Sequence, residues 1–302
     1  MQTSIKILLQ EMKVLIFGGN GMLGHKLVQV LQKRFSVWTT LRTNFADFEN
    51  YGIFDPERVI GDVDVENFDS VQKVFDVSEP DVVINAVGII KQLPKSKEVI
   101  KTLKINSIFP HQLAQLAHAT GARLITISTD CVFNGRKGNY NEEDVSDAED
   151  LYGKSKNLGE VFADGCLTLR TSIIGRELNT SHSLVEWFLS NYGGKVKGFT
   201  KAIYTGFPTI ALADIISDLI ENHKDLQGLY HVSSEPISKF DLLCLIKNFY
   251  KVPIEIEPYA DFKIDRSLDS SKFRKETGFA PPGWEKMIEK MAQDPTPYDN
   301  FR

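Results

Sequence analysis

The chain has little cysteine and shows no pattern in what it has. Cys131, Cys166 and Cys244 are the three cysteines among 302 residues, and they stand far apart. Such separation fits neither the ligand spacing of a metal site nor a disulfide framework. We therefore expect no bound metal, and a reducing cytoplasmic environment suits the sequence best.

Long apolar and long basic runs are also missing. No apolar stretch approaches the ~20 residues that cross a bilayer, so we expect no membrane span. The formal net charge is −5, which disfavours a nucleic-acid or membrane-surface partner and still leaves room for a local basic pocket. Residues 1–11 hold a short apolar patch without a small-residue cleavage site, and we interpret them as an extension before a domain that starts near Met12.

A glycine-rich turn follows the first apolar run, at residues 14–17. Gly18, Gly21 and Gly24 recur every third residue, and an apolar pattern with helical spacing comes next. A strand, a glycine turn and a helix in this order are typical of a dinucleotide-binding unit, because glycine lets the backbone approach a pyrophosphate at the helix N-terminus. The alternative is an ordinary turn between a strand and a helix. The cofactor-binding residues expected here are Gly18, Asn20, Gly21, Met22, Leu23 and Gly24.

The end of the second predicted strand, residues 36–42, indicates which dinucleotide binds. An acidic residue there would bind the ribose hydroxyls of NAD, whereas an arginine suits the 2′-phosphate of NADP. The chain has Thr40 and Arg42 and no acid, which favours NADP(H) while leaving NAD(H) open. The alternative is that Arg42 is a solvated loop charge.

Strands and helices alternate through the first two-thirds of the chain. We predict further strands at 59–60, 81–88, 123–128, 166–172 and 228–233, with helices near 67–78, 106–120, 209–223 and from Leu151, and a loop at 89–101. This alternation predicts an α/β fold with a Rossmann-type, doubly wound parallel sheet. The last third is more mixed, with helices at 183–192 and 284–291, a capping box at Ser238, a strand at 254–259 and a partly extended tail. We therefore expect an NAD(P)-binding domain over 12–172, with about 206–233, and a smaller C-terminal α/β substrate-binding lobe from 173–205 and 234–302.

Tyr152 and Lys156 carry the predicted chemistry. They stand four residues apart on a predicted helix, so both project from one face. A nearby ammonium favours the phenolate and would make the tyrosine an acid or base near neutrality. A hydroxyl from Thr129 or Ser128, at the end of the preceding strand, could bind the oxygen of a carbonyl substrate while a nicotinamide transfers hydride. The alternative is an exposed tyrosine and lysine, but the order of the motifs would bring them all to one sheet edge.

These segments together resemble the extended short-chain dehydrogenase/reductases. Residues 18–24, 128–135 (STDCVFNG) and 151–160 (LYGKSKNLGE) carry the likeness, which continues at 169–172 and 228–233. More narrowly, they are similar to the dTDP-4-dehydrorhamnose reductase family. The resemblance implies that Tyr152 protonates the C4 oxygen of the sugar, that Lys156 lowers the tyrosine pKa and holds the cofactor ribose, and that Thr129 hydrogen-bonds the substrate.

The same resemblance implies further contacts. Asp62 and Val63 would lie at the adenine, and Ala86, Val87 and Gly88 would form the strand end beside the cofactor. Asp130, Val132 and Arg266 would lie on the substrate side, Arg266 near a diphosphate.

Two departures from the family pattern leave the substrate open. Cys131 replaces a tyrosine, and Ile173, Ile174 and Gly175 stand where a tryptophan and a Tyr-Gly pair are usual. These positions line the sugar pocket in that family, so the sugar and its nucleotide (dTDP, UDP, GDP or CDP) stay undetermined.

The leading expectation is NADPH-dependent reduction of a nucleotide-linked 4-keto sugar. One alternative is an epimerase with tightly bound NAD; a dehydratase is disfavoured because Cys131 stands where that class has an acid. Another is a non-catalytic NADP-binding regulatory subunit. The expected partner is a nucleotide sugar, and a homodimer is left open.

Overall fold

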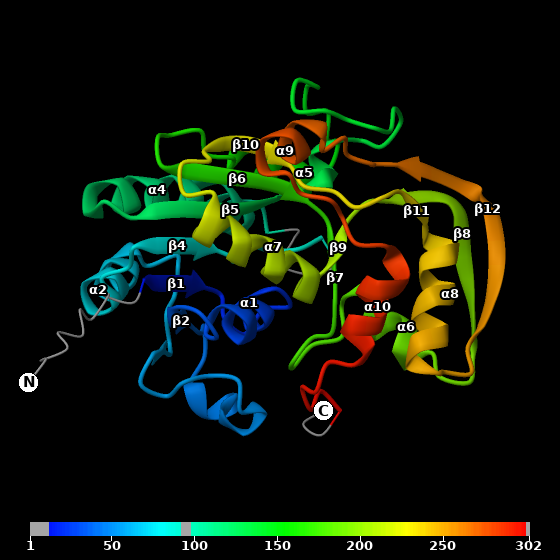
Figure 1. Ribbon diagram of the computed structural model, residues 1–302, viewed down its shortest axis with the longest axis horizontal. Helices are drawn as coiled ribbons and strands as arrows, with labels where there is room; N and C mark the ends of the chain where they lie inside the picture. Colours follow the sequence, from blue (N-terminus) through cyan, green and yellow to red (C-terminus); the bar gives the residue numbers. More distant parts are fainter. Residues whose placement is uncertain (1–11, 92–97, 300–302) are drawn as a thin grey trace, which may run out of the picture.

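The computed structural model describes residues 12–91 and 98–299, and its centre is a seven-stranded parallel sheet (Figure 1). The strand order is β10-β6-β5-β4-β1-β2-β3, and every pair in it is parallel. The strands are β1 (Lys13–Phe17), β2 (Ser36–Thr40), β3 (Val59–Ile60), β4 (Val82–Asn85), β5 (Arg123–Thr129), β6 (Cys166–Thr171) and β10 (Gly228–His231). The extension at 1–11 lies outside the described residues.

Helices cover both faces of the sheet because its strands are apolar on both sides. On one face, α1 (Gly24–Leu31) packs beside α7 (Thr209–Asn222), and Leu27, Leu31 and Ile216 are fully buried there. On the other face lie α2 (Phe68–Ser78) and α4 (Phe109–Thr120), with Phe75 and Leu113 in a separate cluster. The predicted Rossmann-type, doubly wound fold is confirmed.

The order of strands fixes where a ligand can enter. β1 lies between β2 and β4, so the connections from β1 and from β4 run in opposite directions. Open α/β sheets bind ligands in the crevice that this reversal opens at the carboxyl ends of the strands. The glycine turn after β1 and the small residues after β4 both border this point.

A second, smaller lobe stands beside the carboxyl edge of the sheet (right side of Figure 1). Its three-stranded sheet has the order β11-β8-β12, from β8 (Lys195–Tyr204), β11 (Ile237–Ser238) and β12 (Glu255–Asp265). Its helices are α6 (Leu184–Ser190), α8 (Lys239–Tyr250) and α10 (Trp284–Ala292). Phe188, Leu242, Ile246 and Ile288 form its core, each fully buried.

Several predicted elements need correction. Strand β8 was not predicted, and β12 is longer than the predicted strand at 254–259. The predicted helix at 106–120 begins earlier, as α3 (Val99–Leu103) and a π-helical turn (Lys104–Ile108) that runs into α4. Residues 99–101 of the predicted loop are therefore helical, whereas its residues 92–97 lie outside the described part. The predicted cap is confirmed, since the Ser238 hydroxyl accepts a hydrogen bond from the Asp241 N–H at 3.0 Å.

Short elements complete the chain. Strands β7 (Ile173–Ile174) and β9 (Phe207–Pro208) pair between the two lobes. Helix α9 (Ser271–Thr277) was not predicted, and Phe273 on it packs in the core of the large sheet. The division of the chain between the lobes stays a prediction, and this helix sits with the large one. Short helical turns also occur at Phe45–Asp47, Glu49–Tyr51 and Asp130–Val132.

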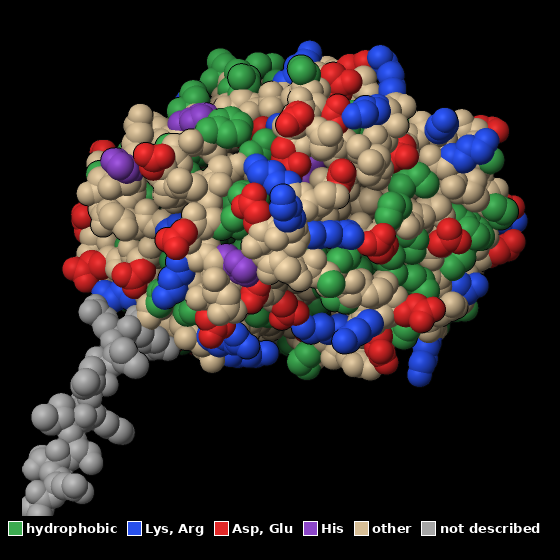
Figure 2. Space-filling model, turned by 45° about the horizontal axis from the view of Figure 1, so that its top comes forward, with side chains coloured by type: hydrophobic (Ala, Val, Ile, Leu, Met, Phe, Trp, Pro, Cys, Tyr) green, Lys and Arg blue, Asp and Glu red, His purple; other side chains and the backbone are tan. Residues whose placement is uncertain are grey.

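Charged side chains of both signs are interspersed over the face drawn in Figure 2. In the described residues, no helix is both long enough and apolar enough to cross a membrane.

Candidate active site

The shape of the glycine turn depends on glycine at Gly18 and at Gly24. Gly18 has a φ of +88°, in the left-handed region, and its N–H donates to the Thr40 hydroxyl of β2 at 3.2 Å. A Cβ on Gly24 would overlap the Gly18 carbonyl oxygen. The turn also closes on itself, with the Gly21 N–H 3.0 Å from the Gly18 oxygen. The backbone is thus held at the start of α1, open to a ligand from outside.

A cavity of about 420 Å³ lies over this turn. Asn85 enters it from β4, and its side-chain Nδ2 is buried without a hydrogen-bond partner among the described residues. A buried orphan donor beside a glycine cradle fits a polar ligand such as a dinucleotide. The predicted cofactor residues that line this cavity are Asn20, Gly21, Met22, Leu23, Arg42, Ala86, Val87, Gly88, Tyr152 and Lys156.

Four predicted cofactor residues do not line it. Gly18 and Gly24 belong to the glycine turn and determine its backbone shape, but they do not line the cavity. Val63 is buried in the sheet core, and the Asp62 side chain is exposed after β3. Their N–H groups bond to the Thr43 and Leu41 carbonyls, which follow β2. The role of Asp62 and Val63 at an adenine stays a prediction.

The three predicted catalytic residues meet in the same cavity. Thr129 ends β5, and Tyr152 and Lys156 stand one turn apart on α5 (Leu151–Leu158). The Lys156 Nζ donates to the Ile127 carbonyl at 2.7 Å, and burial lowers the pKa of Lys156 to about 8. Burial raises the pKa of Tyr152, while a hydrogen bond with the Thr129 hydroxyl opposes this. The lowering of the tyrosine pKa by Lys156 stays a prediction.

Two glycines let α5 approach the sheet edge closely. A Cβ on Gly153 would overlap the Cys131 carbonyl oxygen, and one on Gly159 would overlap that of Asn106 in the π-helical turn. The Asn106 side chain bonds both backbone groups of Ile89, at 2.8 and 3.0 Å, and also the Ser155 hydroxyl. The π-turn thereby joins the strand end after β4 to the helix that carries Tyr152.

Glu160 lies two residues after the end of α5 and attaches this end of the helix to strands β5 and β6. Its carboxylate accepts two hydrogen bonds from the Arg170 guanidinium of β6, each 2.7 Å, and one from the Ser128 hydroxyl at 2.6 Å. Glu160 and Arg170 are 2% and 4% exposed, so the pair is sealed from water. Ser128 and Thr129 both line the cavity, but the Ser128 hydroxyl donates its proton to this carboxylate. Glu160 and Arg170 both lie within the segments that carry the family resemblance, but the sequence alone indicated no role for them.

A second cavity of about 690 Å³ opens toward the small lobe. It shares lining residues with the first, among them Asp130, Cys131, Ser172 and Ile173, so the two cavities adjoin. Burial raises the pKa of Asp130, whereas the Arg266 guanidinium lowers it. The cavity is also lined by residues that we did not predict, notably Trp187, Phe199, Tyr204, Lys239 and Phe262.

The predicted substrate-binding residues do not all line the second cavity. Asp130 and Arg266 line the second cavity, and the Arg266 Nε donates to the Phe133 carbonyl at 2.7 Å. Val132 is fully buried in a small cluster with Phe133 and lines neither cavity, so its side chain points away from the predicted substrate. Ile173 and Ile174, which replace the usual family residues, do line the second cavity.

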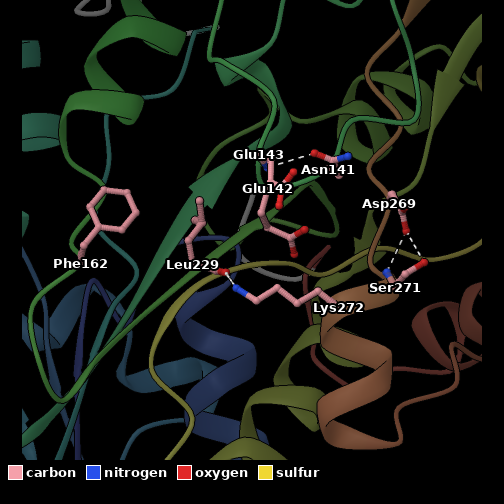
Figure 3. Close-up of a pocket in the computed structure, with 8 residues that line it drawn as sticks. All are labelled: Asn141, Glu142, Glu143, Phe162, Leu229, Asp269, Ser271 and Lys272. Carbon is pink, nitrogen blue, oxygen red and sulfur yellow. Dashed lines mark hydrogen bonds between the residues drawn. The ribbon is translucent and has the colours of Figure 1, made fainter.

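A third cavity, of about 620 Å³, lies outside the candidate site (Figure 3). It contains Glu142, Leu229 and Lys272, and the Lys272 ammonium donates to the Leu229 carbonyl of β10 at 3.0 Å. The Glu142 carboxylate accepts from the His231 N–H of the same strand at 2.8 Å. These side chains occupy backbone groups on the outer edge of the sheet, which explains the polar lining without a ligand. No described group of acidic, histidine or cysteine side chains could hold a metal.

Curated proteins with different names are similar to this chain along most of its length. The spore coat polysaccharide biosynthesis protein SpsK of Bacillus subtilis is 28% identical, over 93% of this chain and 97% of its own. A dTDP-4-dehydrorhamnose reductase of Aggregatibacter actinomycetemcomitans is 25% identical, over 92% and 98%. The methionine adenosyltransferase 2 subunit beta of Mus musculus is 26% identical, over 92% and 89%.

Solved structures agree in fold. A hypothetical dTDP-4-dehydrorhamnose reductase from Sulfolobus tokodaii superposes with a TM-score of 0.75 at 28% identity, over 91% of this chain and 98% of its own. The dTDP-4-dehydrorhamnose reductase from Bacillus anthracis in complex with NADP gives 0.76 at 24% identity, over 93% and 98%. The model of the RmlD substrate binding domain matches residues 12–296, nearly all of the described chain. The chain therefore belongs to the RmlD substrate binding domain family.

Proposed function

We propose that this protein catalyses NADPH-dependent reduction of the 4-keto group of a nucleotide-linked deoxysugar. One observation carries the proposal: Thr129, Tyr152 and Lys156 line the cavity above the glycine turn, where it joins the cavity of the small lobe. A cofactor over the turn and a sugar in the small lobe would thus meet at these three side chains.

Each of the three residues has a distinct role in the proposal. The Thr129 hydroxyl donates a hydrogen bond to the ketone oxygen and orients it. The Tyr152 hydroxyl delivers a proton to that oxygen; its raised pKa keeps it protonated until the oxygen becomes basic. Lys156 supports the resulting phenolate with its ammonium and holds the cofactor ribose. Bound NADPH would supply the hydride.

The rest of the ligand would lie in the second cavity. Arg266 and Lys239 supply positive charge for a diphosphate, and Trp187, Phe199 and Phe262 supply apolar surface for the base or sugar. Asp130 lies between the two cavities and would bind sugar hydroxyls. The contact of Val132 with the substrate is not retained, because that side chain is buried in the core.

Arg42 supports NADP(H) as the preferred dinucleotide. It lies at the first cavity after β2, where a 2′-phosphate would be placed, and the related Bacillus anthracis reductase holds NADP. NAD(H) is the alternative cofactor. We keep the cytoplasm as the predicted location of the reaction.

Titration of the purified protein with NADPH and NADH, followed by dTDP-4-keto-6-deoxy sugar, tests the proposal. We expect tighter binding of NADPH and its oxidation when the sugar is added. Tyr152→Phe should abolish turnover and spare NADPH binding, whereas Tyr192→Phe, at a tyrosine that is 71% exposed, should retain both. Turnover that survives in Tyr152→Phe would contradict the assigned proton donor.

A second candidate is a non-catalytic NADP-binding subunit of another enzyme. The similarity to methionine adenosyltransferase 2 subunit beta, over 92% of this chain, favours it. NADPH binding without oxidation, across dTDP, UDP, GDP and CDP sugars, would support this candidate. Purification with tightly bound NAD and sugar epimerisation would instead support the third, an epimerase.

We also propose a homodimer. The apolar side chains of Ile100, Ile108 and Leu158 are 74%, 50% and 60% exposed, on α3, the π-turn and α5, which contact one another. Such neighbouring exposed apolar residues favour an interface. Light scattering should show a dimer for the wild type and a monomer for Ile108→Glu. A wild-type monomer would contradict the proposal.

A further inference from the structure

The segment after α10, residues 293–299, crosses from the small lobe to the first turns of α1; we call it the C-terminal strap. Its Asp294 carboxylate pairs with the Lys26 ammonium, and both side chains are almost fully buried, at 6% and 3% exposed. Lys26 also donates to the Thr296 hydroxyl at 3.0 Å, and Gln29 donates to the same hydroxyl at 2.8 Å. Figure 1 shows the strap as the red end of the described chain below α10.

His25 connects the strap to the glycine turn. Its Nδ1 lies 2.8 Å from the Gly21 carbonyl oxygen, and its Nε2 lies 2.9 Å from the Tyr298 hydroxyl. The ring is fully buried, and burial lowers the pKa of His25 to about 3, so it is neutral. A carbonyl oxygen can only accept, so Nδ1 carries the proton, and the Tyr298 hydroxyl proton is shared between Nε2 and the Asp294 carboxylate, whose oxygen lies 3.0 Å from that hydroxyl. Tyr298 thus links Gly21, through His25, to the Asp294 carboxylate of the strap.

The strap also holds the opposite wall of the first cavity. Arg176 is buried and donates to the Glu186 carboxylate at 2.7 Å and to the Asp299 carboxylate at 2.5 Å. Its guanidinium lies 4.8 Å from the centre of the Tyr298 ring. Glu177, the next residue, lines the cavity. Tyr298 therefore contacts the supports of both the glycine turn and the loop that faces it.

We propose that Tyr298 is a positioning residue for the dinucleotide: through His25 it holds the Gly21 carbonyl, and so keeps the glycine turn in its phosphate-binding shape. The inference rests on the proposed binding of NADP(H). A turn held in place before binding pays no ordering cost when the ligand arrives, which raises affinity. The chemical step at Tyr152 does not involve the strap, so its effect falls on binding.

Tyr298→Phe removes the hydroxyl and keeps the ring beside Arg176. Losing one buried hydrogen bond should weaken NADPH binding by about tenfold. We expect Kd and KM for NADPH to rise together while kcat stays within about twofold. The matched control is Tyr230→Phe, which also removes a buried tyrosine hydroxyl from a carboxylate, that of Glu276 beside β10. The control should leave Kd and KM for NADPH unchanged.

A double-mutant cycle with His25→Phe distinguishes an effect that passes through His25 from a general destabilisation of the protein. If Tyr298 acts through His25, the double variant should bind NADPH no more weakly than His25→Phe alone. Additive losses would overturn the proposal, and so would an unchanged Kd in Tyr298→Phe or an equal loss in Tyr230→Phe. A wild type that binds neither nucleotide overturns this inference and the proposed function together. NADPH binding that depends on Tyr298, without ketone reduction, would support the inference and overturn the reductase.

Discussion

The Glu160 carboxylate binds the Arg170 guanidinium through two hydrogen bonds of 2.7 Å and so fastens the end of α5 to strand β6. Neither side chain is accessible to water. Removing one charge from such a pair leaves the other buried and uncompensated. The position of Tyr152 and Lys156 therefore depends on two residues that line neither cavity of the candidate site.

Glu160→Gln should lower the free energy of unfolding by about 3–5 kcal/mol, because Arg170 would stay buried without a counter-charge. Urea unfolding at pH 7 measures this change. The control is Glu149→Gln, which breaks the exposed pair with Arg136 and should cost less than about 1 kcal/mol. Equal losses in the free energy of unfolding would show that the buried pair stabilises the protein no more than the exposed pair does.

The rate of ketone reduction should fall as the pH rises through about 8. Burial lowers the pKa of Lys156 to about 8, so its ammonium is present below this pH and is lost above it. The raised pKa of Tyr152 keeps the proton donor protonated over the same range. A kcat profile from pH 6 to 10 measures the fall. Lys156→Arg, whose guanidinium stays charged, should lose the transition; a wild-type profile that is flat to pH 10 would exclude the assigned role.

Gly24→Ala should disrupt the turn over which the cofactor is proposed to bind. Its Cβ would overlap the Gly18 carbonyl oxygen, so the backbone must shift, at about 1–3 kcal/mol. NADPH binding and urea unfolding should both weaken. Gly283→Ala is the matched control, because Gly283 has a φ of −62° and open space around its Cβ position. A Gly24→Ala protein that binds NADPH normally would contradict this account of the turn.

Arg42→Ala should weaken NADPH binding at least about tenfold and leave NADH binding nearly unchanged, because only NADPH carries the 2′-phosphate. Fluorescence titration with each nucleotide measures the ratio. Arg34→Ala, which removes an exposed arginine paired with Glu221, controls for the loss of surface charge. Parallel losses for both nucleotides would count against a specific phosphate contact.

The large sheet could be predicted from the sequence because its signals are local. The apolar runs of β1, β4 and β6 and the glycine turn each lie within a few residues, and their alternation with helices predicts a parallel sheet. The candidate site could be predicted for the same reason, since Thr129 ends a strand and Tyr152 and Lys156 stand four residues apart on one helix. Their convergence on one cavity agrees with the expected geometry.

Strand β8 was missed because its stability comes from distant partners. Its sequence, KVKGFTKAIY, contains three lysines and a glycine that break the apolar pattern, and it pairs with β12 and β11, far along the chain. The π-turn depends likewise on Asn106 bonding to Ile89. The contacts between Lys26 and Asp294 and between His25 and Tyr298 join positions about as distant as the chain permits. No periodicity within a short window contains such information.

The capping of β10 by Glu142 and Lys272 has a consequence for how copies of this protein behave in a crowded solution. An outer strand with unpaired N–H and C=O groups is a template on which another chain can add a strand. Here the His231 N–H already donates a hydrogen bond to the Glu142 carboxylate, and the Leu229 carbonyl already accepts one from the Lys272 ammonium. The opposite outer strand, β3, is only two residues long. Both ends of the seven-stranded sheet are thus poor sites for intermolecular β-pairing.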